Sequence, residues 1–165
     1  PFLLTVSYLE THHQNDRDSY DAPREYAGRY KSAWVPPDLR ALPGSWPGQL
    51  GDYYGCVSAI DACVGRLRRT LASTGLDRNT ILVFTSDHGC HFRTRNTEYK
   101  RSPHDSSLHV PLIIEGPGLQ PALAVDELVS HVDYTPTLLD AVGLHAPAGM
   151  QGRSFLPLRR VAVAQ

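Results

Sequence analysis

The apolar residues of the chain gather into short runs that end in polar side chains. Five of the six residues from Ile81 to Ser86 are apolar or β-branched, which is typical of a buried parallel strand. A second run, Val110 to Ile114, is expected to re-enter the same sheet. Phe2 to Tyr8 is apolar along nearly its whole length and is predicted to be a central strand. Ligands of open α/β sheets bind at the carboxyl ends of the strands, so the residues after these runs are the first candidates for a site.

Helical periodicity is strongest from Leu50 to Ala72. Apolar residues recur there at the i, i+3, i+4, i+7 spacing, and Gly75 lies just past the end. This helix is expected to pack on the sheet and to lead into the strand that follows it. A further strand is predicted at Glu127–Val132, and then a helix with Thr135-Pro136 as N-cap and first residue and with Gly143 as its stop.

Residues 17–49 are rich in proline and glycine, which predicts an irregular excursion without long helices. Its length exceeds that of ordinary connections and favours a functional loop that covers a site. Trp34 and Trp46 are expected to anchor the loop by burying their rings. The tail, Pro147–Arg160, is loop-rich. Together the pattern predicts an α/β fold with a mostly parallel sheet flanked by helices, and residues 1–165 as a single domain.

Composition narrows the class of partner. The chain has 165 residues, a net charge of -1 and a mean hydropathy of -0.29, which favours neither nucleic acid nor a membrane surface as a partner. No apolar run approaches the roughly 20 residues that span a bilayer. Three cysteines argue against a disulfide framework, and Cys56 and Cys63 lie too far apart along the predicted helix to pair. Because the chain opens with Pro1 on a core-like strand, we expect a segment of a longer polypeptide, with any targeting signal upstream.

Chemistry-bearing side chains follow two of the predicted strands. Asp87 and His88 come directly after Ile81–Ser86, and His12 and His13 follow Phe2–Tyr8. Taken by itself, a pair such as His12-His13 more often belongs to a solvated loop than to a site. The region after His88 is cationic, with Arg93, Arg95, Lys100, Arg101, His104 and His109. A hard metal-ligand pair followed by a cationic loop suits a small oxyanion as substrate, and Arg93 and His104 are candidate substrate-binding residues.

Lysine is rare in this chain, which makes Lys100 informative. The sequence holds two lysines and fourteen arginines, so a compact point charge is favoured at Lys100. His12 could donate a hydrogen bond to a sulfate oxygen or protonate a leaving group. Asp87 would supply a hard oxygen ligand to a metal, and His88 a nitrogen ligand.

At these residues the chain resembles a known family. FTSDHG, EYKRSPHDSSLHVPLIIEGPG, DYTPTLLDAVGL and GMQGRSFLPL, together with VSYLETHHQND and DYYGCVSAIDACVGRL, are similar to the second half of the sulfatase catalytic domain, in the alkaline phosphatase superfamily. The resemblance implies Asp87 and His88 as metal ligands, Lys100 as the residue that binds the sulfate and leaving-group oxygens, and His12 as the active-site histidine. It also implies a divalent metal, calcium first and manganese or magnesium as alternatives.

The sequence departs from the family at several positions. The family often has Asn at the position of His88, an arginine at His109 and a proline at Thr11. Its nucleophile is a formylglycine made from Cys or Ser in a C/S-x-P-x-R motif, which residues 1–165 lack. We therefore expect the formylglycine upstream, in a missing N-terminal half of the same domain, and expect this chain alone to be inactive.

The resemblance implies a segment of a metal-dependent sulfatase that acts on a small-molecule or carbohydrate sulfate ester. Aryl, carbohydrate and choline esters all remain open as substrates. One alternative is a phosphodiesterase or phosphonate monoester hydrolase of the same superfamily. Another is a catalytically inactive, truncated sulfatase-like segment.

Overall fold

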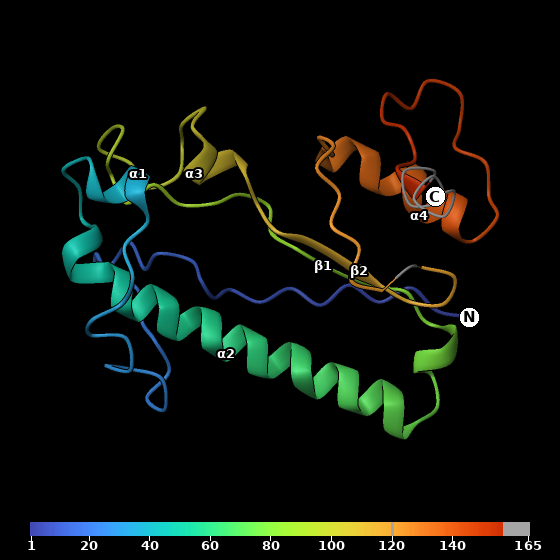
Figure 1. Cartoon of the computed structure of the whole chain (residues 1–165), viewed down its shortest axis with the longest axis horizontal. Coiled ribbons are helices and arrows are strands. Elements are labelled where there is room, and N and C mark those ends of the chain that lie inside the picture. Colours follow the sequence, from blue (N-terminus) through green and yellow to red (C-terminus); the bar gives the residue numbers. More distant parts are fainter. Residues whose placement is uncertain (120, 157–165) are drawn as a thin grey trace. The chain divides into compact units, whose positions relative to one another are not determined.

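The computed structural model describes residues 1–119 and 121–156. Contacts divide the chain into two compact units: residues 1–80 with 84–113 form unit 1, and residues 81–83 with those from 114 onward form unit 2. The elements in chain order are α1 (Pro37–Arg40), α2 (Trp46–Ser73), a 3-10 turn η1 (Asp77–Asn79), β1 (Leu82–Thr85), α3 (Asp105–Leu108), β2 (Leu112–Glu115), a 3-10 turn η2 (His131–Asp133) and α4 (Tyr134–Ala141) (Figure 1).

Helix α2 confirms the strongest helical prediction and extends it. It starts at Trp46, four residues before the predicted start, with Pro47 in its first turn, where a missing N–H is tolerated. It ends at Ser73, and Gly75 follows with φ of +71°, the left-handed conformation that glycine adopts without strain. The predicted loop 17–49 is irregular apart from the single turn of α1 and the start of α2.

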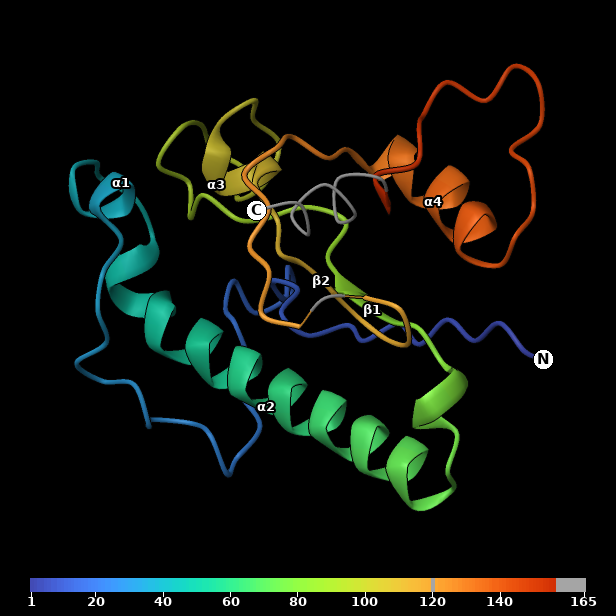
Figure 2. The ribbon, with the colours of Figure 1, turned by 45° about the vertical axis from the view of Figure 1, so that its right-hand side comes forward.

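The sheet is smaller than predicted. Within the described residues it has two strands, β1 and β2, where the apolar runs at Ile81–Ser86 and Val110–Ile114 predicted them. Figures 1 and 2 show the chain running in opposite directions along these two strands. All of β1 is only half-buried. The mostly parallel sheet is therefore not confirmed, because a parallel sheet of this size needs strands that the described residues do not contain.

Two strand predictions are wrong. Phe2–Tyr8 forms no strand, and its side chains are exposed, Leu3 to 87%. No strand within the described residues pairs with its backbone, and without a ladder partner an apolar run cannot be a sheet strand. Glu127–Val132 is irregular and passes into η2, because Ser130 and Asp133 form a reciprocal capping box that satisfies the N–H groups of this turn.

The core of unit 1 is aromatic and joins three segments of the sequence. Tyr20, Leu39, Leu50 and Phe92 are buried together, and Trp46, Tyr53 and Cys90 pack against them among others. The hydroxyl of Tyr20 lies 2.7 Å from Cys90 Sγ, and the N–H of Ser45 donates to the carbonyl of Phe92. Trp46 thus anchors the loop as predicted. Trp34 does not, since it is 66% exposed. This core fixes the 17–49 loop against the segment after β1, where the candidate site lies.

Unit 2 is organised around Asp133 and α4. Asp133 accepts hydrogen bonds from the N–H groups of Ser130 and Arg153, and these bonds lower the pKa of its carboxyl. The buried hydroxyl of Thr137 accepts from the N–H of Phe155, which is also buried. Helix α4 begins at Tyr134, two residues before the predicted first residue Pro136, with Asp133 as N-cap, and Gly143 follows its end as predicted, with φ of +76°. The last part of the predicted loop-rich tail, residues 157–160, lies outside the described residues.

Candidate active site

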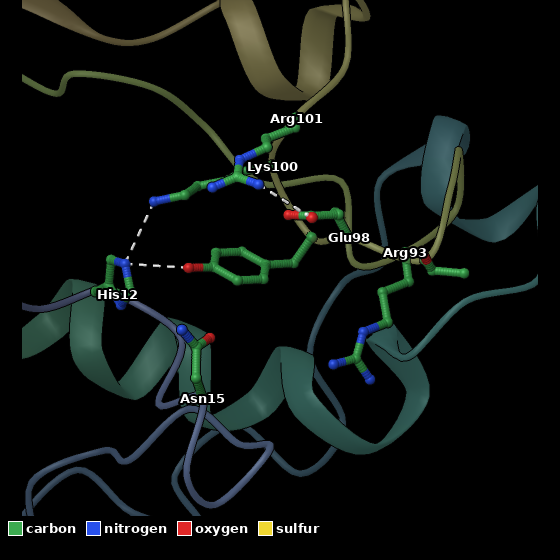
Figure 3. A pocket seen from close by; sticks show the side chains of 8 residues that line it. His12, Asn15, Arg93, Glu98, Lys100 and Arg101 are labelled. Atoms are coloured by element: carbon green, nitrogen blue, oxygen red, sulfur yellow. Dashed lines mark hydrogen bonds and ion pairs between the residues drawn. The ribbon is translucent and has the colours of Figure 1, made fainter.

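A polar pocket of about 440 Å³ lies in unit 1, between the end of the N-terminal segment and the loop after β1. Its volume falls in the range of roughly 300–1,000 Å³ that is usual for small-molecule sites. Figure 3 shows the side chains that converge on it. The lining residues are His12, Asn15, Arg93, Thr97, Glu98, Tyr99, Lys100 and Arg101.

The structure brings together the two residues predicted to be catalytic. His12 Nε2 lies 3.3 Å from Lys100 Nζ, although 88 residues separate them in the sequence. The hydroxyl of Tyr99 lies 3.0 Å from the same nitrogen (Figure 3). The other ring nitrogen, Nδ1, lies 2.6 Å from the carbonyl oxygen of His13. Both nitrogens of His12 are therefore engaged, and Nε2 is the one that faces the pocket cation.

His13 is buried next to His12, although it is not a lining residue of the pocket. It is 2% exposed, so the solvated-loop reading is wrong for this member of the pair. Its Nδ1 lies 3.2 Å from Asn15 Oδ1, and its Nε2 lies 3.2 Å from Asp18 Oδ1, in ion-pair contact but without hydrogen-bond geometry. Its ring packs edge-on against Tyr20 and lies tilted over Tyr99 at 4.7 Å between centroids. These contacts fix the backbone that carries His12.

Asp18 links the N-terminal loop to the loop after β1. Arg93 donates to both of its carboxylate oxygens, at 2.5 and 3.1 Å. These hydrogen bonds are the main cause of the lowered pKa of Asp18 and of the raised pKa of Arg93. Bidentate pairing of this kind is more directional than a lysine contact. Arg93 lines the pocket as a partly neutralised cation, and its role in substrate binding stays a prediction.

The pocket lining carries three cations, Arg93, Lys100 and Arg101, and one carboxylate, Glu98. Arg101 forms an ion pair with Glu98 at 3.2 Å, as Arg93 does with Asp18. Lys100 has no carboxylate partner among the residues that the structure describes. One positive charge thus remains at the pocket, and Lys100 carries it.

Asp87 and His88 lie close together but outside the lining of this pocket. His88 Nε2 is 3.3 Å from Asp87 Oδ2, and the carboxylate is 84% exposed. His88 Nδ1 lies 2.9 Å from the carbonyl of Gly89, so it carries the proton, and the Nε2 lone pair faces the carboxylate of Asp87. Within residues 1–119 and 121–156 no group of three His, Cys, Asp or Glu side chains could hold a metal. The pair can supply two ligands.

His104, the other predicted substrate-binding residue, is not part of the pocket lining. It lies at the N-cap of α3 with an exposed side chain. Sequence reasoning in turn did not single out Tyr99, Asn15, Thr97 or Glu98 as pocket residues. By residue type each of them is an ordinary loop residue. The only indication of a site in the sequence was that Tyr99 directly precedes Lys100.

His91 is a buried neighbour of this region. It is fully buried, and neither ring nitrogen has a hydrogen-bond partner. Burial is the main cause that lowers its pKa. Its own backbone opposes that shift in part, and the nearby charges of His104 and Arg95 add to it. Its backbone N–H donates to the carbonyl of Tyr99 at 2.7 Å and so fixes the loop that carries the pocket residues.

Comparison with known proteins places these features in a family. The family model described as Sulfatase matches residues 1–144. Arylsulfatase K of Bos taurus is 42% identical over 105 residues, which is 64% of this chain and 19% of that protein. The chain thus spans about a fifth of the length of the curated relatives it matches. No helix in the described part of the chain is long and apolar enough to cross a membrane.

Solved structures are similar as well. The phosphonate monoester hydrolase of Silicibacter pomeroyi is 33% identical with a TM-score of 0.62, over 66% of this chain and 22% of that one. A protein solved in complex with its substrate D-glucosamine-2-N,6-O-disulfate is 36% identical with a TM-score of 0.60, over 72% of this chain and 25% of that one.

Proposed function

Because the chain belongs to the sulfatase family, we propose that it supplies one side of the active site of a metal-dependent sulfatase that hydrolyses sulfate esters. The observation that carries the proposal is the convergence of His12 and Lys100 on one pocket, with 3.3 Å between Nε2 and Nζ. Fixed donors and a cation aimed at one point are what the oxygens of a sulfate ester require in the transition state.

The charge of the pocket supports a singly charged ester. With Arg93 and Arg101 in ion pairs, Lys100 leaves about one positive charge. A sulfate ester carries one negative charge, whereas a phosphate monoester carries close to two at neutral pH. The pocket therefore matches a sulfate ester better than a phosphate monoester.

Lys100 and His12 have different roles in the proposed reaction. The ammonium of Lys100 donates hydrogen bonds to the ester and leaving-group oxygens. At rest His12 has its proton on Nδ1, against the carbonyl of His13, so Nε2 accepts hydrogen bonds. It can protonate a leaving oxygen only after it has taken up a second proton, and Lys100 and Tyr99 are the two hydrogen-bond donors next to it.

Several lining residues of the pocket have side chains that form hydrogen bonds. Asn15, Thr97 and Glu98 can bind hydroxyl groups, which suits a carbohydrate sulfate better than a bare aryl sulfate. The similar protein bound to a glucosamine disulfate supports the same substrate class.

Asp87 and His88 fit a divalent cation as two of its ligands. The Nδ1–H of His88 donates to the carbonyl of Gly89, an arrangement that metal-binding histidines commonly use, and it leaves the lone pair of Nε2, next to the Asp87 carboxylate, as a ligand. The exposed carboxylate of Asp87 suits calcium, with manganese or magnesium as alternatives. When bound, the metal neutralises charge on the ester oxygens. We place its other ligands and the formylglycine nucleophile outside residues 1–165.

The test joins residues 1–165 to a nucleophile-bearing sulfatase half and measures hydrolysis of an aryl sulfate. Lys100→Ala and His12→Ala should each lower kcat by about 10²–10³, the usual cost of one transition-state donor. Lys31→Ala, which removes the other lysine of the chain at an exposed site, should leave the rate unchanged. Equal rates for Lys100→Ala and Lys31→Ala would refute the assignment.

A second candidate function is phosphonate monoester hydrolysis. The similarity to the Silicibacter pomeroyi enzyme favours it, and a phosphonate monoester also carries one negative charge. Rates on a sulfate ester and on a phosphonate monoester with the same leaving group separate the two. A higher kcat/KM on the phosphonate would reverse our assignment.

A further inference from the structure

Tyr99 contacts both residues that the proposed function makes catalytic. Its hydroxyl lies 3.0 Å from His12 Nε2, and Lys100 Nζ lies 5.3 Å from the centroid of its ring. Tyr99 directly precedes Lys100 in the sequence, so both side chains come from the same loop. Beyond being a hydrogen-bond donor next to His12, Tyr99 has no assigned role in the proposed reaction.

The direction of the hydrogen bond follows from its neighbours. His12 Nδ1 lies 2.6 Å from the carbonyl oxygen of His13, and a carbonyl can only accept. Nδ1 therefore carries the hydrogen of the neutral ring, and the lone pair is on Nε2. Tyr99 consequently donates its hydroxyl hydrogen to Nε2, and the ammonium of Lys100, which can only donate, lies beside the same lone pair.

Tyr99 is itself held on three sides. The N–H of His91 donates to its carbonyl at 2.7 Å, and the buried ring of His13 covers its face at 4.7 Å between centroids. His12 meets its edge at 5.8 Å, with the two ring planes at 84°. A hydroxyl on so well-fixed a ring is a directional anchor, because the phenol cannot rotate away from its acceptor.

We propose that Tyr99 is a positioning residue of the ester-hydrolysing site, which holds the Nε2 lone pair of His12 beside the ammonium of Lys100. The carbonyl of His13 holds one end of the imidazole, and the hydroxyl of Tyr99 holds the other. Without the hydroxyl, Nε2 keeps only the ammonium of Lys100, on a flexible side chain, as its donor. The ring then pivots about Nδ1, and Nε2 leaves the position where it meets the leaving oxygen. The inference rests on the proposed function, since it gives His12 and Lys100 their catalytic roles.

The test is Tyr99→Phe, which removes the hydroxyl and keeps the ring that packs on His13. Tyr26→Phe is the matched control, because Tyr26 also has a cation over its ring, Arg29 at 4.9 Å, but is not a lining residue. The first readout is nitrogen NMR of the imidazoles in the 165-residue chain, with His12 assigned by His12→Gln. We expect the Nδ1–H tautomer in the wild type and a shift of the Nε2 resonance toward that of a free imidazole in Tyr99→Phe only.

The second readout is kinetics in the enzyme joined to a nucleophile-bearing half. Tyr99→Phe should lower kcat roughly tenfold, a part of the 10²–10⁴-fold that acid–base groups contribute, with KM within about twofold. A proton on Nε2 in the wild type, an unmoved Nε2 resonance, or equal kcat for Tyr99→Phe and Tyr26→Phe would each overturn the inference. Full activity in Lys100→Ala would instead refute the proposed function, while the NMR result on Tyr99 stands by itself.

Discussion

Replacing His91 by leucine should stabilise unit 1. The imidazole is fully buried, and its two nitrogens have no hydrogen-bond partner. Each buried polar group left unpaired costs about 1–3 kcal/mol, and a leucine of similar volume avoids that cost and buries more apolar area. We expect a gain of about 1–3 kcal/mol. The backbone contacts of residue 91, to Tyr99 and Thr94, do not depend on the side chain and should persist.

The effect should depend on pH with a definite sign. Burial lowers the pKa of His91 in the folded chain, so the unfolded chain binds a proton more readily. The wild type therefore keeps its full stability above the unfolded pKa of about 6.5 and loses part of it as the pH falls below that value. Leucine does not titrate, so the advantage of His91→Leu should widen between pH 7 and pH 5.

Urea unfolding followed by tryptophan fluorescence measures this, because Trp34 and Trp46 both lie in unit 1. The midpoint should rise for His91→Leu, and in thermal unfolding Tm should rise by roughly 2–4 °C per kcal/mol. His109→Leu is the control at an exposed histidine and should change stability little. Destabilisation of His91→Leu by 1 kcal/mol or more, or a gap that does not widen in acid, would show that the imidazole is hydrogen-bonded in the folded protein.

Three further outcomes are expected. Gly89→Ala should destabilise unit 1 by about 1–3 kcal/mol in the same urea assay, because the new Cβ would lie 2.2 Å from the backbone oxygen of Ser106; a neutral result would contradict this packing. The pKa of Cys56 is raised to about 11 by burial, so its thiol should resist iodoacetamide in the folded chain at pH 8, and mass spectrometry would reveal rapid labelling if that is wrong. Asp18→Asn should lower the unfolding midpoint at pH 7, because it removes the ion pair with Arg93. This pair stabilises the folded chain above the unfolded pKa of Asp18, and the stabilisation is lost as the carboxyl is protonated. A midpoint difference that persists at pH 2 would argue against that cause.

Helix α2 and the pairing of Asp87 with His88 could be predicted from local sequence. The helix follows from the repeat of apolar residues within a few turns, and the pair consists of adjacent residues. Phe2–Tyr8 shows the limit of the same reasoning, because an apolar run indicates that a strand could be buried but not whether a neighbouring strand is present to pair with it. At η2 the capping bonds of Ser130 and Asp133 outweighed a weak strand pattern.

The candidate site, too, was predictable from the sequence only in part. Residue types indicated His12 and Lys100, and the rarity of lysine pointed to the second of them. The contact between them across 88 residues, the exclusion of His104 and the hydroxyl of Tyr99 on His12 could not be predicted from the sequence, since each depends on how distant loops pack around the Tyr20 and Phe92 core.

The sequence by itself determined the family, the long helix, the turns with glycine at their ends and the kinds of side chain that the site contains. These are local properties, set by spacing along the chain and by the chemistry of single residues. The tertiary structure decided which cations are in ion pairs, which histidines are buried and which nitrogen of His12 faces Lys100. Those properties depend on distances of a few ångströms between segments far apart in the sequence, and electrostatic and hydrogen-bond energies change steeply over such distances.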